Sequence, residues 1–373
     1  MFQILAEAKN LEKMGKDVIH FEIGDPDFDT PPNVKSAAYR AIEENHTHYT
    51  ISQGLEEFRE QAIKTTYLSR KFKPSIEQIL VTPGANIQIY LTILALANPG
   101  DDIIITDPSF VSYASIIALC NMNAIKVPLM EENNFSIDPD DIEKAISKKT
   151  KLMILNSPNN PTGSIISENS YRRIYEIAEK NNIFILSDEV YGRMIYDKKD
   201  FFSPSSIDHC NERVIVAHSF SKSFAMTGWR IGGLTGPKNL IDKMTLILET
   251  ITSCVSPFIH LAALEAMKGS QDYVEKMILT FKKRRDILVD GLNSIDGISC
   301  LLPPGSFYAF PNIAKTKMSS IEFSNYLLEN AFIATCPGIY FGEYGKNNVR
   351  FCFATDESKI IQALDRMKKI FLK

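Results

Sequence analysis

Short apolar runs alternate with longer amphipathic stretches through the middle of the chain. Several of these runs are continuously hydrophobic, which is typical of strands that are buried on both faces of a sheet. Because helix-length segments separate many of them, the pattern predicts an α/β fold in which a mostly parallel sheet lies between helices. The predicted strands are 78–84, 102–108, 151–158, 184–191, 214–221 and 230–236.

The last third of the chain has a different pattern, in which strands and helices are mixed. Helical periodicity covers 272–293, 319–330 and 357–372. The apolar runs that we interpret as strands are 297–303, 306–313, 332–338 and 349–354. This part of the sequence predicts a smaller α+β unit.

The predicted domains are interleaved, because the chain contains no internal repeat and no linker rich in Pro, Gly or Ser. The first forty-odd residues comprise a helix, a strand and a loop rich in Gly and Pro, too little to fold alone. We expect them to pack with the C-terminal unit. The predicted division is a large α/β domain at 46–265 and a small α+β domain formed by 1–45 and 266–373.

The composition narrows the possible partners and the compartment. Lys and Arg number 41 against 45 Asp and Glu, so no basic excess is available for a nucleic acid. Six scattered cysteines show no C-x-x-C spacing, which argues against a disulfide scaffold. There is no recognisable signal peptide, and the most apolar stretch, 87–97, is too short to cross a bilayer. We therefore expect a cytoplasmic protein with a small substrate and no membrane partner.

Polar or Gly-rich clusters follow five of the predicted strands. In an open parallel sheet, ligands bind beyond the carboxyl ends of the strands. Any one cluster could be an ordinary turn, but five that converge favour a binding site. The clusters are 82–86, 107–110, 156–163, 187–191 and 218–222.

The residue types in these clusters indicate which cofactor the site could bind. The motifs G-x-G-x-x-G, G-x-x-x-x-G-K-[ST] and H-E-x-x-H are absent, and six isolated histidines give no metal-ligand spacing, so we expect no metal. Residues 219–222 satisfy S-x-x-K, yet neither S-D-N nor K-T-G follows. What remains is Lys222, which can form a Schiff base, Asp188, which can hold a pyridine nitrogen protonated, and Arg230, which with serines can bind phosphate. This set fits pyridoxal phosphate.

Three longer segments resemble the class I/II aminotransferases, the fold-type I pyridoxal-phosphate enzymes related to aspartate aminotransferase. They are SFSKSFAMTGWRIGG (219–233), NSPNNPTG (156–163) and SDEVYGRM (187–194), supported by IGDPDFDTP (23–31), PPGSFYAF (303–310) and VRFCFA (349–354). The resemblance runs nearly from end to end and in the right order. It implies a large cofactor-binding domain with a mostly parallel sheet between helices, and a smaller α+β domain.

The resemblance also implies roles for residues around the cofactor ring. Lys222 matches the Schiff-base lysine, which also moves the proton between Cα and C4′. Asp188 matches the partner of the pyridine nitrogen, and Tyr191 and Asn160 match the residues that hydrogen-bond O3′. Phe110 matches the aromatic residue that stacks on the ring.

For the phosphate, the resemblance implies a set of side chains and backbone groups at the start of a helix, which is a favourable site for an anion. The residues that match this set are Arg230, Ser219, Ser221, Ala85 and Asn86, together with Tyr49, which would reach the phosphate of the other subunit in a dimer.

For the substrate, Arg350 matches the arginine that grips the α-carboxylate, assisted by Asn160 and the backbone at Gly24. Aspartate-specific relatives carry a lysine where this chain has Asn86, so we expect that aspartate is not the preferred donor.

The implied function is an aminotransferase that moves an amino group between an amino acid and a 2-oxo acid by a ping-pong mechanism. A decarboxylase or lyase on the same scaffold is the alternative, because the residues do not show which bond at Cα breaks. A cofactor-binding regulator is a third possibility, but no segment of the chain suggests a DNA-binding unit. The resemblance further implies a homodimer with shared active sites, although the arm before 23–31 is shorter than usual.

Overall fold

A seven-stranded sheet forms the centre of the larger part of the molecule, in a computed structural model that describes residues 2–371. The strand order is β2-β8-β7-β6-β5-β3-β4; β8 runs antiparallel to both of its neighbours, and the other paired strands run parallel. The strands are β2 (Ile79–Thr82), β3 (Asp102–Asp107), β4 (Asn123–Pro128), β5 (Thr150–Asn156), β6 (Phe184–Asp188), β7 (Val214–Ser219) and β8 (Gly232–Thr235). The predicted mostly parallel α/β sheet is confirmed.

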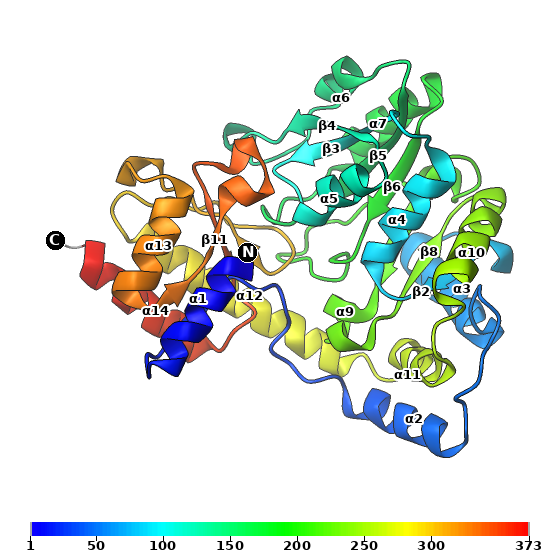
Figure 1. Ribbon diagram of the computed structural model, residues 1–373, viewed down its shortest axis with the longest axis horizontal. Coiled ribbons are helices and arrows are strands. Elements are labelled where there is room, and N and C mark those ends of the chain that lie inside the picture. Colours follow the sequence, from blue (N-terminus) through cyan, green and yellow to red (C-terminus); the bar gives the residue numbers. More distant parts are fainter. Residues whose placement is uncertain (1, 372–373) are drawn as a thin grey trace.

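Helices cover both faces of this sheet (Figure 1). One face packs on α4 (Ala85–Leu96), α5 (Val111–Leu119) and α10 (Lys238–Thr252). The other packs on α6 (Pro139–Ala145) and α7 (Glu168–Lys180), near the short α8 (Ser205–Asp208). Alternate residues of the buried strands, such as Met153 and Ile154 of β5, belong to opposite cores because successive side chains point to opposite faces.

The sequence pattern identified six of the seven strands and missed β4. This strand lies at the edge of the sheet and pairs only with β3. Its sequence is NAIKVP, and most of its residues are exposed or half-buried. An edge strand of this kind lacks the continuous apolar run on which the prediction depended.

In the smaller part of the molecule, the C-terminal segment contributes three α-helices and a three-stranded antiparallel sheet in the order β11-β12-β9. Figure 1 shows it on the left, with the long α12 running toward the centre. Its elements are α12 (Asp272–Asn293), β9 (Tyr308–Ala309), α13 (Ser320–Ala331), β10 (Ile333–Ala334), β11 (Cys336–Pro337), β12 (Val349–Cys352) and α14 (Glu357–Phe371). The three predicted helices are confirmed, although residue 372 of the last lies outside the described residues. The strand predicted at 297–303 is wrong, because only Ser299 forms an isolated bridge there.

The N-terminal segment divides between the two parts. Helix α1 (Phe2–Lys13) and β1 (Ile19–His20) join the smaller part, where β1 pairs in parallel with β10. Helix α2 (Pro32–Glu43) instead packs on α11 (Pro257–Lys268), close to α3 (Glu56–Arg70) and α9 (Phe220–Ser223). The expectation that the first forty-odd residues pack with the C-terminal unit therefore holds for α1 and β1 but not for α2. The domain boundaries at 45/46 and 265/266 stay a prediction.

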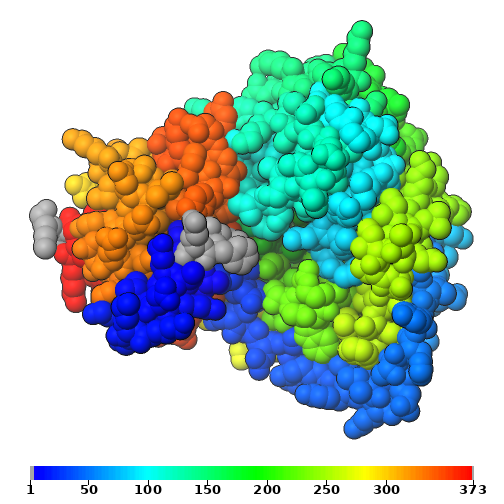
Figure 2. Space-filling view, in the orientation of Figure 1, coloured from blue at the N-terminus to red at the C-terminus, as the bar shows by residue number. Residues whose placement is uncertain are grey.

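The space-filling view shows these two parts as neighbouring lobes (Figure 2). The blue N-terminal helix lies with the orange and red C-terminal elements in one lobe, and the cyan and green elements of the large sheet form the other. Among the described residues, no helix combines the length and apolar character needed to cross a bilayer.

Candidate active site

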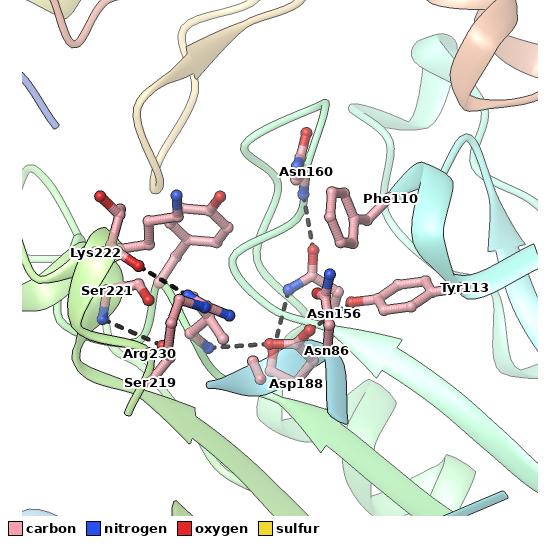
Figure 3. A pocket seen from close by; sticks show the side chains of 14 residues that line it. Asn86, Phe110, Tyr113, Asn156, Asn160, Asp188, Ser219, Ser221, Lys222 and Arg230 are labelled. Atoms are coloured by element: carbon pink, nitrogen blue, oxygen red, sulfur yellow. Dashed lines mark hydrogen bonds between the residues drawn. The ribbon is translucent and has the colours of Figure 1, made fainter. Parts of the chain in front are cut away.

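A cavity of about 220 Å³ lies beside the carboxyl ends of β5, β6 and β7, where the sequence places its polar clusters (Figure 3). Ten of the predicted site residues line it: Ala85, Asn86, Phe110, Asn160, Asp188, Tyr191, Ser219, Ser221, Lys222 and Arg230. Four further lining residues were not predicted: Tyr113, Asn156, Val190 and Thr227. Segments that are up to 145 residues apart in the chain, from Ala85 to Arg230, thus meet in one place.

Lys222 projects from α9, the single helical turn that follows β7. Ser219 caps this turn by accepting a hydrogen bond from the backbone N–H of Ser221. The Lys222 ammonium donates to the carbonyl oxygen of Gly24. Burial lowers the pKa of Lys222 to about 8, which brings the neutral, nucleophilic amine within reach near neutral pH.

Asp188 is the last residue of β6 and lines the cavity. Its carboxylate accepts a hydrogen bond of 2.6 Å from the Tyr113 hydroxyl and one of 3.1 Å from the backbone N–H of Val190. Burial raises the pKa of Asp188 above its usual range. A cation would stabilise this buried carboxylate, and the cavity that Asp188 lines has room for a cationic group.

A third part of the cavity lining, at the start of α4 and Arg230, is suited to bind an anion. Helix α4 begins at Ala85, so its first backbone N–H groups lack helical partners. Gly84 before it has a φ of +79°, and a Cβ there would lie 2.3 Å from Nη2 of Arg230. Only glycine therefore lets the guanidinium approach the start of the helix so closely. Arg230 itself is anchored by donation from Nη1 to the Thr227 carbonyl, at 2.8 Å.

Two asparagines, Asn156 and Asn160, connect Asp188 to Arg350 through hydrogen bonds. Asn156 donates to the carbonyl of Asp188 at 3.0 Å and accepts from the backbone N–H of Asn160 at 2.8 Å. The side-chain oxygen of Asn160 in turn accepts from Nη1 of Arg350 at 3.0 Å. The loop after β5 thus holds Asn160 between the two predicted binding groups.

Arg350 lies on β12 in the smaller part and is 2% exposed. Its Nη2 donates to the backbone carbonyl of Glu22 at 2.6 Å. The rings of Tyr308 and Phe341 flank its guanidinium, with centroids at 4.5 and 4.8 Å. The structure therefore places Arg350 next to the cavity, in contact with the lining residue Asn160.

Tyr49 is the one predicted residue that the chain does not bring near the cavity lining. Its side chain is 88% exposed and it lies in the segment between α2 and α3. Phe110, by contrast, lines the cavity and meets Tyr113 edge to face at 5.7 Å. Gly24 lies beside Lys222 through the carbonyl contact described above.

Sequence reasoning missed the residues that hold the site in place. Tyr113 lies on α5, a helix so apolar that its aromatic residue is indistinguishable from core. Its spacing, three residues after Phe110, is the one available signal, because residues i and i+3 share a helix face. Tyr308 lies within the matching segment 303–310, yet nothing in that segment indicates that its hydroxyl contacts the Tyr191 hydroxyl, at 2.8 Å.

A half-buried amine, a buried carboxylate and a group of lining residues suited to bind an anion meet at one cavity of this α/β fold, which is the arrangement of an enzyme active site. The sequence model of the family Aminotransferase class I and II matches residues 16–367. The chain belongs to this family.

Individual relatives agree with the family. An aspartate aminotransferase of Pyrococcus horikoshii is 41% identical over 95% of this chain and 90% of its own length. Aromatic-amino-acid aminotransferase 2 of Thermococcus litoralis is 36% identical over 95% of this chain and 91% of its own. The crystal structure of aspartate aminotransferase from Rhizobium meliloti matches with a TM-score of 0.95 at 32% identity, over 99% of this chain and 94% of that one. The protein is an aminotransferase, and the sequence-based prediction of this reaction class is confirmed.

Proposed function

We propose that the cavity holds pyridoxal 5′-phosphate, covalently attached at Lys222, and that this group carries the amino group between an amino acid and a 2-oxo acid. The observation that carries the proposal is the placement of Lys222, Asp188 and Arg230 around one cavity. The three corners match the aldehyde, the pyridine nitrogen and the phosphate of the cofactor. When bound, the cofactor supplies an electron-withdrawing ring that stabilises negative charge at the Cα of the substrate.

Several residues that line the cavity would bind the cofactor. Asp188, whose pKa is raised by burial, would regain a cationic partner in the protonated ring nitrogen, so binding would relieve an unfavourable burial. Arg230, Ser219, Ser221 and the start of α4 would hold the phosphate. Phe110 would pack on the ring face.

Proton transfer and substrate binding would fall to a second set of groups. The amine of Lys222, with a pKa lowered to about 8, is suited to take the proton from Cα and return it. Arg350 and Asn160 would hold the α-carboxylate, with the backbone at Gly24 beside them. Tyr191 would donate its hydroxyl proton in a hydrogen bond to the ring oxygen O3′.

The amino donor is the finer part of the proposal. Relatives are named for aspartate and for aromatic amino acids. The only cations among the described residues that line the cavity are Lys222 and Arg230, and both have roles toward the cofactor. Asn86 is neutral, so the chain provides no second cation there for a side-chain carboxylate. We therefore propose that aspartate is not the preferred donor.

Borohydride reduction of the holoprotein tests the assignment of Lys222. Reduction should attach the cofactor irreversibly to one peptide, which contains Lys222, and Lys222→Ala should abolish both this labelling and turnover. Lys238→Ala is the matched control, because Lys238 is an exposed lysine of α10 whose ammonium pairs with Asp242. Persistent labelling in Lys222→Ala would overturn the assignment.

A further inference from the structure

Tyr308 touches three groups of the proposed site without lining the cavity itself. Its hydroxyl oxygen lies 2.8 Å from that of Tyr191. Its ring lies 4.5 Å from the guanidinium of Arg350. Its hydroxyl also abuts Gly24 so closely that a Cβ on that glycine would lie 1.9 Å from it. Tyr308 thus contacts both the residue assigned to O3′ and the residue assigned to the substrate carboxylate.

The fold fixes this position from the smaller part of the molecule. Tyr308 lies on β9, which pairs antiparallel with β12, so that Tyr308 is opposite Cys352. Its side chain is 2% exposed and packs in the same core as Phe307 and Phe351. Tyr191 follows β6 in the large sheet, so the pair of hydroxyls joins the two parts of the molecule.

The direction of the hydrogen bond between the two hydroxyls follows from what Tyr191 must do. Each hydroxyl has one proton to donate. Burial raises the pKa of both tyrosines above the usual value, so both stay protonated at neutral pH. If Tyr191 donates its proton to O3′, it has none left for Tyr308. Tyr308 must then be the donor and Tyr191 the acceptor.

We propose that Tyr308 is a positioning residue that donates to Tyr191, strengthens the donation of Tyr191 to the cofactor, and holds the guanidinium of Arg350 against its ring. This inference rests on the proposed function. Hydrogen bonds in a chain polarise one another. When the Tyr191 hydroxyl accepts a proton from Tyr308, it therefore becomes a better donor to O3′ of the cofactor. The ring face attracts the guanidinium independently of the hydroxyl. The two roles can therefore be separated by substitution.

Tyr308→Phe removes the hydroxyl and keeps the ring. With a weaker donor at O3′, the negative charge on that oxygen is less stabilised, and the nitrogen of Lys222 joined to the cofactor keeps its proton to higher pH. The pH midpoint of the visible absorbance of the substrate-free holoprotein should rise by about half to one unit. The KM for the amino acid should stay within about twofold, since Arg350 retains its ring partner.

Two further variants separate the hydroxyl from the ring. Gly24→Ala pushes the Tyr308 hydroxyl aside and should raise the same midpoint, even if Tyr308→Phe fails to fold. Tyr308→Leu removes the ring as well and should add a KM increase of about three- to tenfold. Tyr196→Phe is the matched control, because Tyr196 is a buried tyrosine whose hydroxyl donates only to the Ser306 carbonyl.

The inference is overturned if the midpoint of Tyr308→Phe equals that of the wild type, or if Tyr196→Phe shifts it as far. It is also overturned if Gly24→Ala leaves the midpoint unchanged. Failure of the proposed function would look different. In that case Lys222→Ala would retain the wild-type absorbance and its titration, and the inference would fall with it.

Discussion

Lys222 is buried in a way that destabilises the protein when no cofactor is attached. Its pKa is lowered to about 8 by burial, against an ordinary 10.5 in the unfolded chain. Below pH 8 the folded protein carries the full cost of a buried charge. Between pH 8 and 10.5 the unfolded chain binds more protons than the folded one, so stability rises with pH across this window.

Replacing Lys222 should therefore stabilise the cofactor-free protein. We expect Lys222→Met to raise the free energy of unfolding at pH 7 by about 2–3 kcal/mol, a difference that shrinks to nearly zero above pH 10.5. Urea unfolding of the apoprotein at the two pH values measures it. Lys238→Met, at an exposed position, should stay within about 0.5 kcal/mol of the wild type. A Lys222→Met apoprotein less stable than the wild type at pH 7 would contradict this account.

At the scale of residues, the sequence predicted the groups that do chemistry better than the groups that support them. Lys222, Asp188 and Arg230 were identifiable because they lie in segments that resemble the family and because their combined chemistry fits one cofactor. Tyr113 and Tyr308 were not, because a buried aromatic residue normally serves the core. Their hydroxyl contacts depend on side chains that are distant in the sequence, Asp188 and Tyr191.

At the scale of elements, the end of β3 holds a loop of the smaller part in place. The Asp107 carboxylate accepts hydrogen bonds of 3.1 Å from the backbone N–H groups of Glu343 and Tyr344. Gly342 has a φ of +141°, and a Cβ there would lie 1.9 Å from Asp107. The same loop carries Phe341, whose ring flanks Arg350. This contact therefore links the large sheet to Arg350, the residue proposed to bind the substrate carboxylate.

Loss of the Asp107 contact should affect both stability and substrate binding. We expect Asp107→Ala to lower the free energy of unfolding by about 2–3 kcal/mol, because two backbone N–H groups lose a charged acceptor and Lys126 loses its ion-pair partner. The KM for the amino acid should rise several-fold, with little change in cofactor affinity. Asp138→Ala is the control, since Asp138 caps α6 far along the chain from these groups and costs about 1 kcal/mol. An unchanged KM in Asp107→Ala would show that the loop does not position Arg350.

Also at this scale, the sequence predicted buried elements better than exposed ones. The continuous apolar runs of β3 and β5 correspond to strands buried along nearly their whole length. The edge strand β4 gave no such pattern, and the apolar run 297–303 forms no strand although it resembles one. In both cases the neighbours of the segment in space decide the outcome, and they are not visible in its own pattern.

At the scale of the whole molecule, we expect a homodimer in which Tyr49 reaches the phosphate site of the other subunit. The supporting observation is that four large apolar side chains on and after α2 are exposed: Tyr39, Ile42, Tyr49 and Ile51. Sedimentation of the holoprotein at micromolar concentration should show a dimer, and Tyr49→Ala should weaken cofactor binding without moving Lys222. A holoprotein that sediments as a monomer with full activity would contradict this expectation.

The most direct test of the central claim is a half-reaction with single amino acids and no 2-oxo acid present. The account predicts that a suitable donor changes the visible absorbance of the holoprotein stoichiometrically and releases one equivalent of its 2-oxo acid per site. A 2-oxo acid added afterwards should restore the original absorbance. Release of CO2 and an amine, or of an eliminated fragment, with no 2-oxo acid derived by amino transfer, would contradict the account.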